Sequence, residues 1–504
     1  MDRCYRMSGW HTPAERARRV VTDQGPDRDG HVMGGNVRLR LGIDVACKAA
    51  HQVSCADETG EFLFTGRKFR TTVDDLEKLW ASLPAADDVL VVLEPTRNAW
   101  VLLAAWLRSR GAKVALVPSE QSADLRDYYH KHTKNDRLDS RILARLPLLH
   151  PEGLRVLGDG ELGPADPLRR ATRGRRSLVK RRTATYARID ALLELLGPTW
   201  TEALGSGEYN KTALTLLERT GGDPHAIKRL GRKRLTALLV RASRGQWRDE
   251  HAETILHSAQ QSLRLWAAGG LDFTELAADL SGEARLALQL STEIDGLDDR
   301  IDVLYEEADP AGILLSAPGL GVTSAATILA GLGDPDRFTT LAGVRSFTGL
   351  VPKLDESGTS SRYGPPTKAG DPALREALFN AADRARKTDP TLAARYHRLV
   401  TQNGKHHNSA LCTLAAVLVT RLTACWRNRT PYQLHDTNGQ PITTTEGRTI
   451  CATRYQVTNT DRAKNRSQRA AQRQKQGTGR RRKESRSAPA AGLSTNHTSH
   501  PPAA

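Results

Sequence analysis

Cysteine is scarce in this chain and is not arranged for either of its usual structural roles. Six cysteines are scattered among 504 residues, and no two of them form a C-x-x-C pair. We therefore expect neither a zinc site nor a disulfide framework, and a reducing cytoplasmic setting fits this pattern best. The first twenty residues, MDRCYRMSGWHTPAERARRV, are charged but lack the apolar stretch of a secretory signal.

Long apolar runs are missing as well. The most apolar late stretch, ALCTLAAVLVTRLTAC, is interrupted by Arg421 and is too short to span a bilayer. This stretch predicts a buried helix. We therefore expect a soluble protein without a membrane partner.

Acidic residues are outnumbered by basic ones. The chain has 74 Lys and Arg against 57 Asp and Glu, which gives a formal charge of +17 and a pI of about 9.8. Folding does not require such an excess, so it points to a polyanionic partner, most often nucleic acid. Hydrophobic residues make up 39% of the chain, enough for real cores, and the length suggests two or three domains.

Composition and periodicity divide the chain into five segments. We expect a disordered extension over residues 1–36, an α/β domain over 37–150, and a basic helical and coiled-coil region over 151–310. A mainly α domain follows over 311–433, and a disordered basic tail over 434–504. Residues 461–487 hold 11 Lys or Arg against two acids. Such a tail either holds phosphates through salt-sensitive contacts or is simply solvated, and both interpretations stay open.

The segment 37–150 has the pattern of a mixed α/β sheet. Three strands with tight turns are predicted up to about residue 70, the last turn at DETGE, and a short helix follows at TVDDLEKLWASL. DDVLVVLEP and AKVALVP are apolar runs typical of strands buried on both faces. Between them, NAWVLLAAWLRSRG predicts a helix that ends at Gly111.

The segment 151–310 is predicted to be mostly helical. LRRATRGRRSLVKRRTATYARIDALLELLG has the pattern of a long, very basic helix. LALQLSTEIDGLDDRIDVLYEE carries apolar residues at heptad-like spacing, which is typical of a coiled coil. Helices packing within one chain explain this spacing equally well.

Four acidic residues stand where a ligand site is expected. Asp44 lies in the apolar strand LGIDVA, where an acid is costly to bury without a partner. Glu94 ends the strand VLVVLEP, and ligands of open α/β sheets bind at the carboxyl ends of strands. Asp136 and Asp139, in HTKNDRLDS, are three residues apart and share one face of a helix start.

Each acid taken singly has a structural explanation. Asp44 can pair with a buried base, Glu94 can be a surface acid, and the helix dipole favours Asp136. Together the four would repel one another, and divalent cations relieve such repulsion best. Carboxylate oxygens select Mg²⁺ or Mn²⁺, and two such ions would stabilise the attacking and leaving oxygens of phosphoryl transfer. Lys134 and Arg137 would then face a DNA backbone.

The four acids resemble the D-E-D-D signature of the IS110 family of insertion-sequence transposases. The last motif of that family is usually T-K-T-D-R-x-D-[AS], and this chain has Asn135 in place of the second Thr. The family's first domain is similar to the Holliday-junction resolvase RuvC, which has an RNase H-like fold. The resemblance therefore implies that fold for residues 37–150, with Mg²⁺ or Mn²⁺ held by the four acids.

The second half of the chain contains a turn and a long polar loop that suit phosphate. APGLGVTSAATILAGLG has a Pro-Gly-x-Gly turn of helix-hairpin-helix type, where Gly319 and Gly321 let backbone amides approach a phosphate. SFTGLVPKLDESGTSSRYGPPTKAGDPALREALFNAA is a Gly-, Ser- and Pro-rich loop, and long loops are more often functional than structural. The basic edge of this loop is formed by Arg362, Lys368 and Arg375.

A nucleophile in this loop is not identified by the residues alone. Ser357, Ser360 and Ser361 are equal candidates, no His lies nearby as a base, and serines that merely cap turns are commoner. The loop and its flanks resemble the later domain of the same family, whose pattern is P-G-I-G, G-D, G-L-x-P, S-G, K-x-G and L-R. The matching residues are Pro318–Gly321, Gly333–Asp334, Gly349–Pro352, Ser357–Gly358, Lys368–Gly370 and Leu374–Arg375. In the family the S-G serine is the nucleophile, so the resemblance assigns that role to Ser357.

The resemblance implies a cytoplasmic DNA transposase or site-specific recombinase. In that family, different protomers of a dimer or tetramer supply the acids and the serine, and a structured non-coding RNA guides the protein to donor and target DNA. Two rivals remain. One is a Mg²⁺-dependent structure-specific endonuclease of the Holliday-junction type that uses the acids alone, and the other is an inactive remnant that only binds nucleic acid.

Overall fold

The chain forms two compact units, residues 1–157 and 158–504, which are described separately. The computed structural model describes residues 37–118, 121–122, 124, 136–151, 154–158, 163–357, 360–461, 463 and 467. The predicted extension 1–36, most of the predicted tail beyond residue 461, and Lys134 lie outside the described residues.

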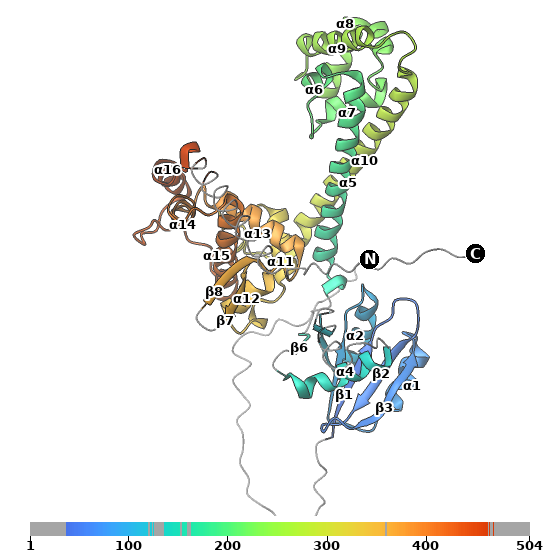
Figure 1. Cartoon of the computed structure of the whole chain (residues 1–504), viewed down its shortest axis with the longest axis vertical. Helices are drawn as coiled ribbons and strands as arrows, with labels where there is room; N and C mark the ends of the chain where they lie inside the picture. The colour runs from blue at the N-terminus through green and yellow to red at the C-terminus, as the bar shows by residue number, and fades with distance from the viewer. Residues whose placement is uncertain are drawn as a thin grey trace, which may run out of the picture. The chain divides into compact units, whose positions relative to one another are not determined.

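The first unit is built on a mixed six-stranded sheet with the strand order β3-β2-β1-β4-β5-β6 (Figure 1). Strands β1, β4 and β5 run parallel, whereas β2, β3 and β6 are antiparallel to their neighbours. The strands and helices predicted up to residue 117 are all present. In chain order the elements are β1 (Arg38–Asp44), β2 (His51–Ala56), β3 (Phe62–Phe69), α1 (Val73–Ala81), β4 (Asp88–Leu93), α2 (Ala99–Ser109), β5 (Lys113–Leu116), α4 (Asp136–Leu149) and β6 (Arg155–Val156).

Helix α4 packs directly on β1 because β1 has a glycine at the contact. A Cβ atom on Gly42 would lie 2.2 Å from both the Ser140 carbonyl oxygen and the Ala144 backbone nitrogen. No side chain fits in that space. The hydroxyls of Ser54 on β2 and Ser140 on α4 lie 2.8 Å apart and are buried, so a hydrogen bond fixes the same contact laterally.

The second unit is mainly helical (Figure 1). Its elements are η3 (Gly163–Ala165), α5 (Pro167–Leu196), α6 (Thr199–Leu204), α7 (Lys211–Thr220), α8 (Pro224–Ser243), α9 (Asp249–Leu265), α10 (Phe273–Ala308), α11 (Val322–Leu332), η4 (Pro335–Arg337), α12 (Leu341–Thr348), β7 (Pro352–Ser357), β8 (Ser360–Pro366), α13 (Pro372–Ala385), α14 (Pro390–Thr401), α15 (His407–Asn428) and α16 (Thr444–Arg454).

Helices α5 and α10 form an antiparallel pair that joins two hydrophobic cores. The start of α5 and the end of α10 belong to a core shared with α11–α15, and their opposite ends belong to a core shared with α6–α9. Arg175 on α5 pairs with Asp298 on α10, and Arg188 pairs with Glu283. The heptad-like spacing in α10 is thus accounted for by packing within one chain, and coiled-coil pairing with a second copy stays a prediction.

Helix α15 confirms the predicted buried helix. By length and hydropathy alone it qualifies as a membrane-spanning candidate. Its apolar residues Leu411, Leu414, Leu418 and Leu422 are at most 1% exposed, and it packs against α12, α13 and α14. These contacts identify α15 as a core helix of the second unit.

Two expectations about the second unit are wrong. The middle of the predicted polar loop, around Ser357, is a β-hairpin, because main-chain pairing of β7 with β8 overrides the low strand propensity of its residues. Residues 434–461 are described and include α16, although a disordered tail was expected from residue 434. A capping box between Thr443 and Glu446 starts α16, and Gly447 packs against the Thr388 carbonyl.

Gly42→Ala is expected to destabilise the first unit. The added methyl group must displace the α4 backbone, and overpacking of this kind costs about 1–3 kcal/mol. Gly296→Ala in α10 is the control, because its Cβ would meet nothing within 4 Å. That substitution should stabilise by about 0.5–1 kcal/mol, since alanine suits a helix better than glycine. Chemical denaturation of both variants measures the difference, and equal effects would contradict the proposed contact.

Asp389→Ala is expected to destabilise the second unit strongly. The Asp389 carboxylate is 1% exposed and accepts hydrogen bonds from Arg421 at 2.9 Å and from the Tyr432 hydroxyl at 2.5 Å. It also caps α14 by accepting from the backbone of Thr391 and Leu392. Burial and the nearby carboxylate raise the pKa of Tyr432, so its hydroxyl stays a donor.

Removing one partner of such a buried pair costs about 3–5 kcal/mol. Tyr432→Phe removes a single donor and should cost about 1 kcal/mol. Urea denaturation compares the two variants with wild type. A smaller loss of stability in Asp389→Ala than in Tyr432→Phe would contradict this assignment.

Candidate active site

Asp44 and Glu94 lie side by side at the carboxyl edge of the sheet. Strands β1 and β4 are parallel neighbours, and Ile43 pairs with Leu93. Asp44 and Glu94 are the next residues on each strand, so their backbones are separated by about one strand spacing, ~4.8 Å. Both side chains are half-buried. The sheet therefore confirms that these two acids come from neighbouring strand ends.

Helix α4 brings Asp136 and Asp139 toward the same edge. Early in the helix, Arg137 donates to the Thr65 hydroxyl at 2.7 Å, within β3. Eight residues later, Arg145 donates to the carbonyl of Gly60, before β3 begins. Helix α4 thus runs opposite to β3 and to β1, with its first turn on the side where β1 ends. Asp139 precedes Ser140, which touches β1 at Gly42.

Glu94 has a partner that the sequence analysis missed. The buried Ser122 hydroxyl donates a hydrogen bond of 2.6 Å to the Glu94 carboxylate. Ser122 follows β5, whose last residue Leu116 pairs with Leu93, so it comes from the third parallel strand at this edge. The position of Ser122 after a strand that ends at this edge was the signal from which it could have been predicted. Ser122 fixes one Glu94 oxygen, and no hydrogen bond from a described residue occupies the other.

The donor set at this edge suits a hard divalent cation. Asp44, Glu94 and α4 supply carboxylate oxygens, and Mg²⁺ and Mn²⁺ prefer such ligands. Among the side chains that the structure describes, no three Asp, Glu, His or Cys stand close enough to hold a metal by themselves. The side chain of Asp136, the first residue of α4, lies outside that set. The fit therefore rests on the chemistry and the backbone placement of the four acids.

His51 holds the segment that follows Asp44. Its Nδ1 accepts a hydrogen bond from the Ala46 amide at 3.1 Å, so Nε2 carries the proton and donates to the Thr71 hydroxyl at 2.7 Å. His51 is 4% exposed, and burial lowers its pKa below the usual 6.5. The sequence analysis did not single out this residue.

The basic residues of α4 also make contacts within the first unit. Arg137 packs on Gly66 besides its bond to Thr65, and Arg141 and Arg145 lie over the ring of Phe62 at 5.0 and 4.5 Å. These contacts fasten α4 to β3. The DNA-binding role predicted for Arg137 stays a prediction.

Ser357 is placed at the tip of the β7–β8 hairpin in the second unit. It is the last residue of β7 and pairs with Ser360, the first residue of β8. The two connecting residues lie outside the described part of the chain, as do the side chains of Ser357, Ser360, Ser361 and Arg362. The structure brings the three candidate serines together, and it does not choose among them.

The base of this hairpin is held by close backbone contacts. A Cβ on Gly349 would lie 1.8 Å from the Ala369 carbonyl oxygen, and one on Gly370 would lie 2.3 Å from that of Phe347. Arg375 donates to the carbonyls of Ala369 and Gly370 at 3.1 and 2.9 Å. The predicted phosphate ligand Arg375 therefore has a structural role as well. Lys368, in the same loop, is exposed.

The two glycines of the predicted phosphate turn differ in their surroundings. Gly319 has a φ of +83°, and a Cβ there would lie 2.6 Å from the Ala385 backbone nitrogen, so close packing on α13 explains it. Gly321 caps the start of α11 and has nothing within 4 Å of its Cβ position. The open position is the better suited of the two to a phosphate.

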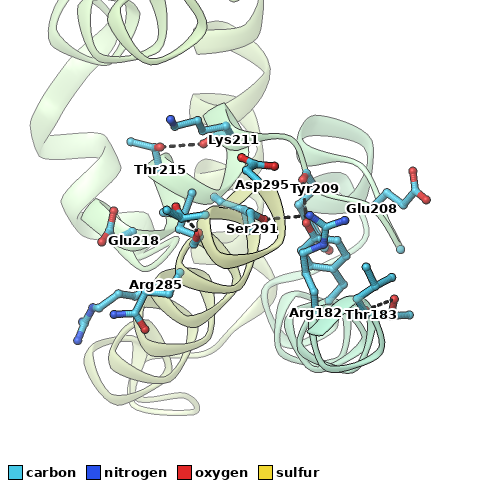
Figure 2. Close-up of a pocket in the computed structure, with 17 residues that line it drawn as sticks. Arg182, Thr183, Glu208, Tyr209, Lys211, Thr215, Glu218, Arg285, Ser291 and Asp295 are labelled. Carbon is cyan, nitrogen blue, oxygen red and sulfur yellow. Dashed lines mark hydrogen bonds between the residues drawn. The ribbon is translucent and has the colours of Figure 1, made fainter. Parts of the chain in front are cut away.

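The second unit also contains a groove of about 890 Å³ between α5, α7 and α10 (Figure 2). Its charged lining is balanced, which makes a polyanion a poor occupant. None of the predicted catalytic residues lines it. The basic residues of the lining are Arg182, Lys211 and Arg285, and the acidic ones are Glu208, Glu218 and Asp295.

The lowered pKa of His51 predicts a pH-dependent stability of the first unit. The unfolded chain binds the His51 proton near pH 6.5, whereas the folded chain binds it only at lower pH. The contribution of His51 is therefore complete above about pH 6.5 and is lost as pH falls below it, by at most about 1.4 kcal/mol per pH unit. His51→Asn retains an acceptor for the Ala46 amide but does not titrate. Its free energy of unfolding should fall less steeply with acidification, and parallel slopes would contradict the assignment.

Comparison with known proteins places both units among transposases. Residues 41–198 match a DEDD family described as Transposase, and residues 311–397 match the Transposase IS116/IS110/IS902 family. The first match implies an RNase H-like fold, with which the mixed sheet of the first unit agrees. The two matches contain the four acids and Ser357, respectively.

Similar curated proteins come from insertion elements of bacteria. The 43.6 kDa protein of insertion element IS110 from Streptomyces coelicolor is 28% identical over 404 residues, which is 79% of this chain and 96% of that protein. The 42 kDa protein of IS900 from Mycobacterium paratuberculosis is 28% identical over 412 residues, 80% of this chain and 98% of that protein. The mini-circle putative transposase for IS117 from Streptomyces coelicolor is 27% identical over 416 residues, 77% of this chain and 94% of that protein. The chain belongs to the IS110 family of insertion-sequence transposases and is a DNA-recombining enzyme.

Proposed function

We propose that this transposase cuts and rejoins DNA with Ser357 as nucleophile and with Mg²⁺ or Mn²⁺ held by Asp44, Glu94, Asp136 and Asp139. The observation that carries the proposal is the carboxyl edge of the sheet, where two strand ends and the first turn of α4 meet. Acids placed together at that edge can act as ligands of a divalent cation. When bound, the metal supplies positive charge that stabilises a phosphate under attack.

The serine chemistry explains how DNA is rejoined without an energy source. The Ser357 oxygen bonds to phosphorus as the bond from phosphorus to the sugar oxygen breaks, and the proton lost by the serine hydroxyl is matched by one that the departing sugar oxygen takes up to become a hydroxyl. The phosphoserine link retains the energy of the broken phosphodiester, and attack by another DNA hydroxyl restores a phosphodiester and frees the serine. The position of Ser357 at a hairpin tip supports this role, because the strand ends there.

The partners follow from the same proposal. The enzyme would act in the cytoplasm as a dimer or tetramer on donor and target DNA, with a structured non-coding RNA as guide. The excess of basic residues supports polyanionic partners. In such a system base pairing reads the sequence, and the protein binds shape and backbone. Lys134, Arg137, Gly319, Gly321, Arg362, Lys368 and Arg375 are the proposed nucleic-acid contacts.

A covalent protein–DNA adduct is the expected product of the proposed reaction. The purified protein is mixed with Mg²⁺ and with DNA and RNA from the flanks of its gene, and the products are separated on a denaturing gel. Wild type should form an adduct, and EDTA should abolish it. Ser357→Ala and Asp136→Ala should each lower the yield by at least about a hundredfold, the scale at which removal of one catalytic donor acts.

Ser360→Ala and Ser361→Ala are the matched controls, since both residues lie in the same hairpin. They should retain the adduct. Cleavage that requires Asp136 but survives Ser357→Ala, without any adduct, would make the protein a metal-dependent nuclease. Binding without cleavage or adduct in wild type would identify an inactive remnant. Omitting the RNA should lower the adduct yield, and an unchanged yield would remove the guide from the proposal.

A further inference from the structure

Helix α8 and the turn after it carry basic residues without any acidic residue among them. Residues 224–248 contain eight Lys or Arg and no Asp or Glu. The helix belongs to the core formed by α6–α9 at one end of the α5–α10 pair, whereas the Ser357 hairpin adjoins the helices around the other end (Figure 1). The catalytic residues proposed above do not account for this concentration of charge.

Three of these cations share one face of α8, and a fourth lies at its C-cap. A kink at Gly231, with φ of 69°, separates them from the start of the helix. At 100° per residue, Lys233, Arg234 and Arg241 fall within an arc of about 100°, and Arg244 follows directly after the helix. All four are exposed, and they span twelve residues, about 16 Å along the axis. The buried side of the same helix segment is formed by Leu235, Leu239 and Ser243.

These four cations are not neutralised by neighbouring acids. Within the described residues, none of them has a carboxylate oxygen within 4.0 Å, whereas Arg232 beside them pairs with Glu253 on α9. The arginines of α5 show a different arrangement, because several of them have acidic partners on α10 and α13. Those partners are Asp298 for Arg175, Glu283 for Arg188, Asp371 for Arg173 and Glu376 for Arg176.

We propose that Lys233, Arg234, Arg241 and Arg244, the α8 cation face, bind the phosphate backbone of a nucleic-acid duplex. Like charges on one helical face repel one another, and a row of phosphates relieves that repulsion while releasing counterions. The exposed Val240 lies among them, and the face has no Asn or Gln to pair with adenine. Contacts to phosphate fix position and carry no sequence information. The proposal rests on the proposed function only for the kind of partner.

The test is fluorescence anisotropy of the full-length protein with a labelled DNA duplex and, separately, an RNA duplex of equal length, over a series of salt concentrations. EDTA is present throughout, so that no metal-dependent chemistry contributes. The test variant combines Lys233→Gln, Arg234→Gln, Arg241→Gln and Arg244→Gln. The control variant removes the same charge from exposed cations elsewhere in the second unit by combining Arg264→Gln, Arg285→Gln, Arg300→Gln and Lys405→Gln.

The test variant should bind one or both duplexes about tenfold or more weakly at ~0.1 M salt, and its log–log salt slope should fall by about 3–4. The control variant should lose much less affinity, and the two variants should have the same melting temperature. The duplex with the larger loss identifies the natural ligand as DNA or RNA. Equal losses and slopes in the two variants would overturn the proposal. A protein that forms no serine adduct but shows this difference would contradict the proposed chemistry alone.

Discussion

The backbone contact between β1 and α4 at Gly42 determines whether the first turn of α4 can lie beside the strand ends that carry Asp44 and Glu94. A strand and a helix normally meet through side chains, and here the Ser140 carbonyl and the Ala144 nitrogen occupy the space of a Cβ atom. The apolar cluster of Val92, Val117, Leu143 and Leu146 also packs α4 against the sheet. Because α4 runs opposite to β1, close packing at the middle of the helix delivers its first turn to the end of the strand. Site residues held by packed elements in this way are positioned more precisely than residues on loops.

The basic residues of this chain belong to two groups with different physical roles. In one group, arginines bind acids, carbonyls or rings and thereby join elements, as Arg173 does with Asp371. Burial would raise the pKa of Asp371, but the hydrogen bonds from Arg173 and from the Ala373 amide outweigh it and hold that pKa below its usual value. In the other group, exposed cations such as Lys233 and Arg241 have no acid beside them among the described residues. Net charge alone does not distinguish the groups, and only the second is free to attract a polyanion.

The sequence predicted the first unit well because its signals are local or periodic. Apolar runs identified β4 and β5, the rule that ligands bind at the carboxyl ends of strands identified Glu94, and the cost of burying an acid in an apolar strand identified Asp44. What escaped prediction depends on contacts distant in sequence. Ser122 is recognisable only once β5 is known to lie beside β4, and His51 only once its ring is known to reach Ala46. The hairpin and α16 escaped because their residues have weak propensities, although the capping box before α16 was a usable signal.

The hairpin in the second unit shows how a family pattern can be mostly structural and still include one proposed nucleophile. Gly349 and Gly370 are matched residues, and each is required by a backbone approach that no side chain permits. Arg375, another matched residue, ties the same loop by two carbonyl bonds. These contacts all lie at the base, where they fix the direction in which β7 leaves the helices. Ser357 is the last residue of β7, at the opposite end of the hairpin, where the main-chain pairing of β7 with β8 ends. The nucleophile proposed above must first attack one phosphodiester and later be displaced from it, and a rigid hairpin base would hold it in one position for both steps.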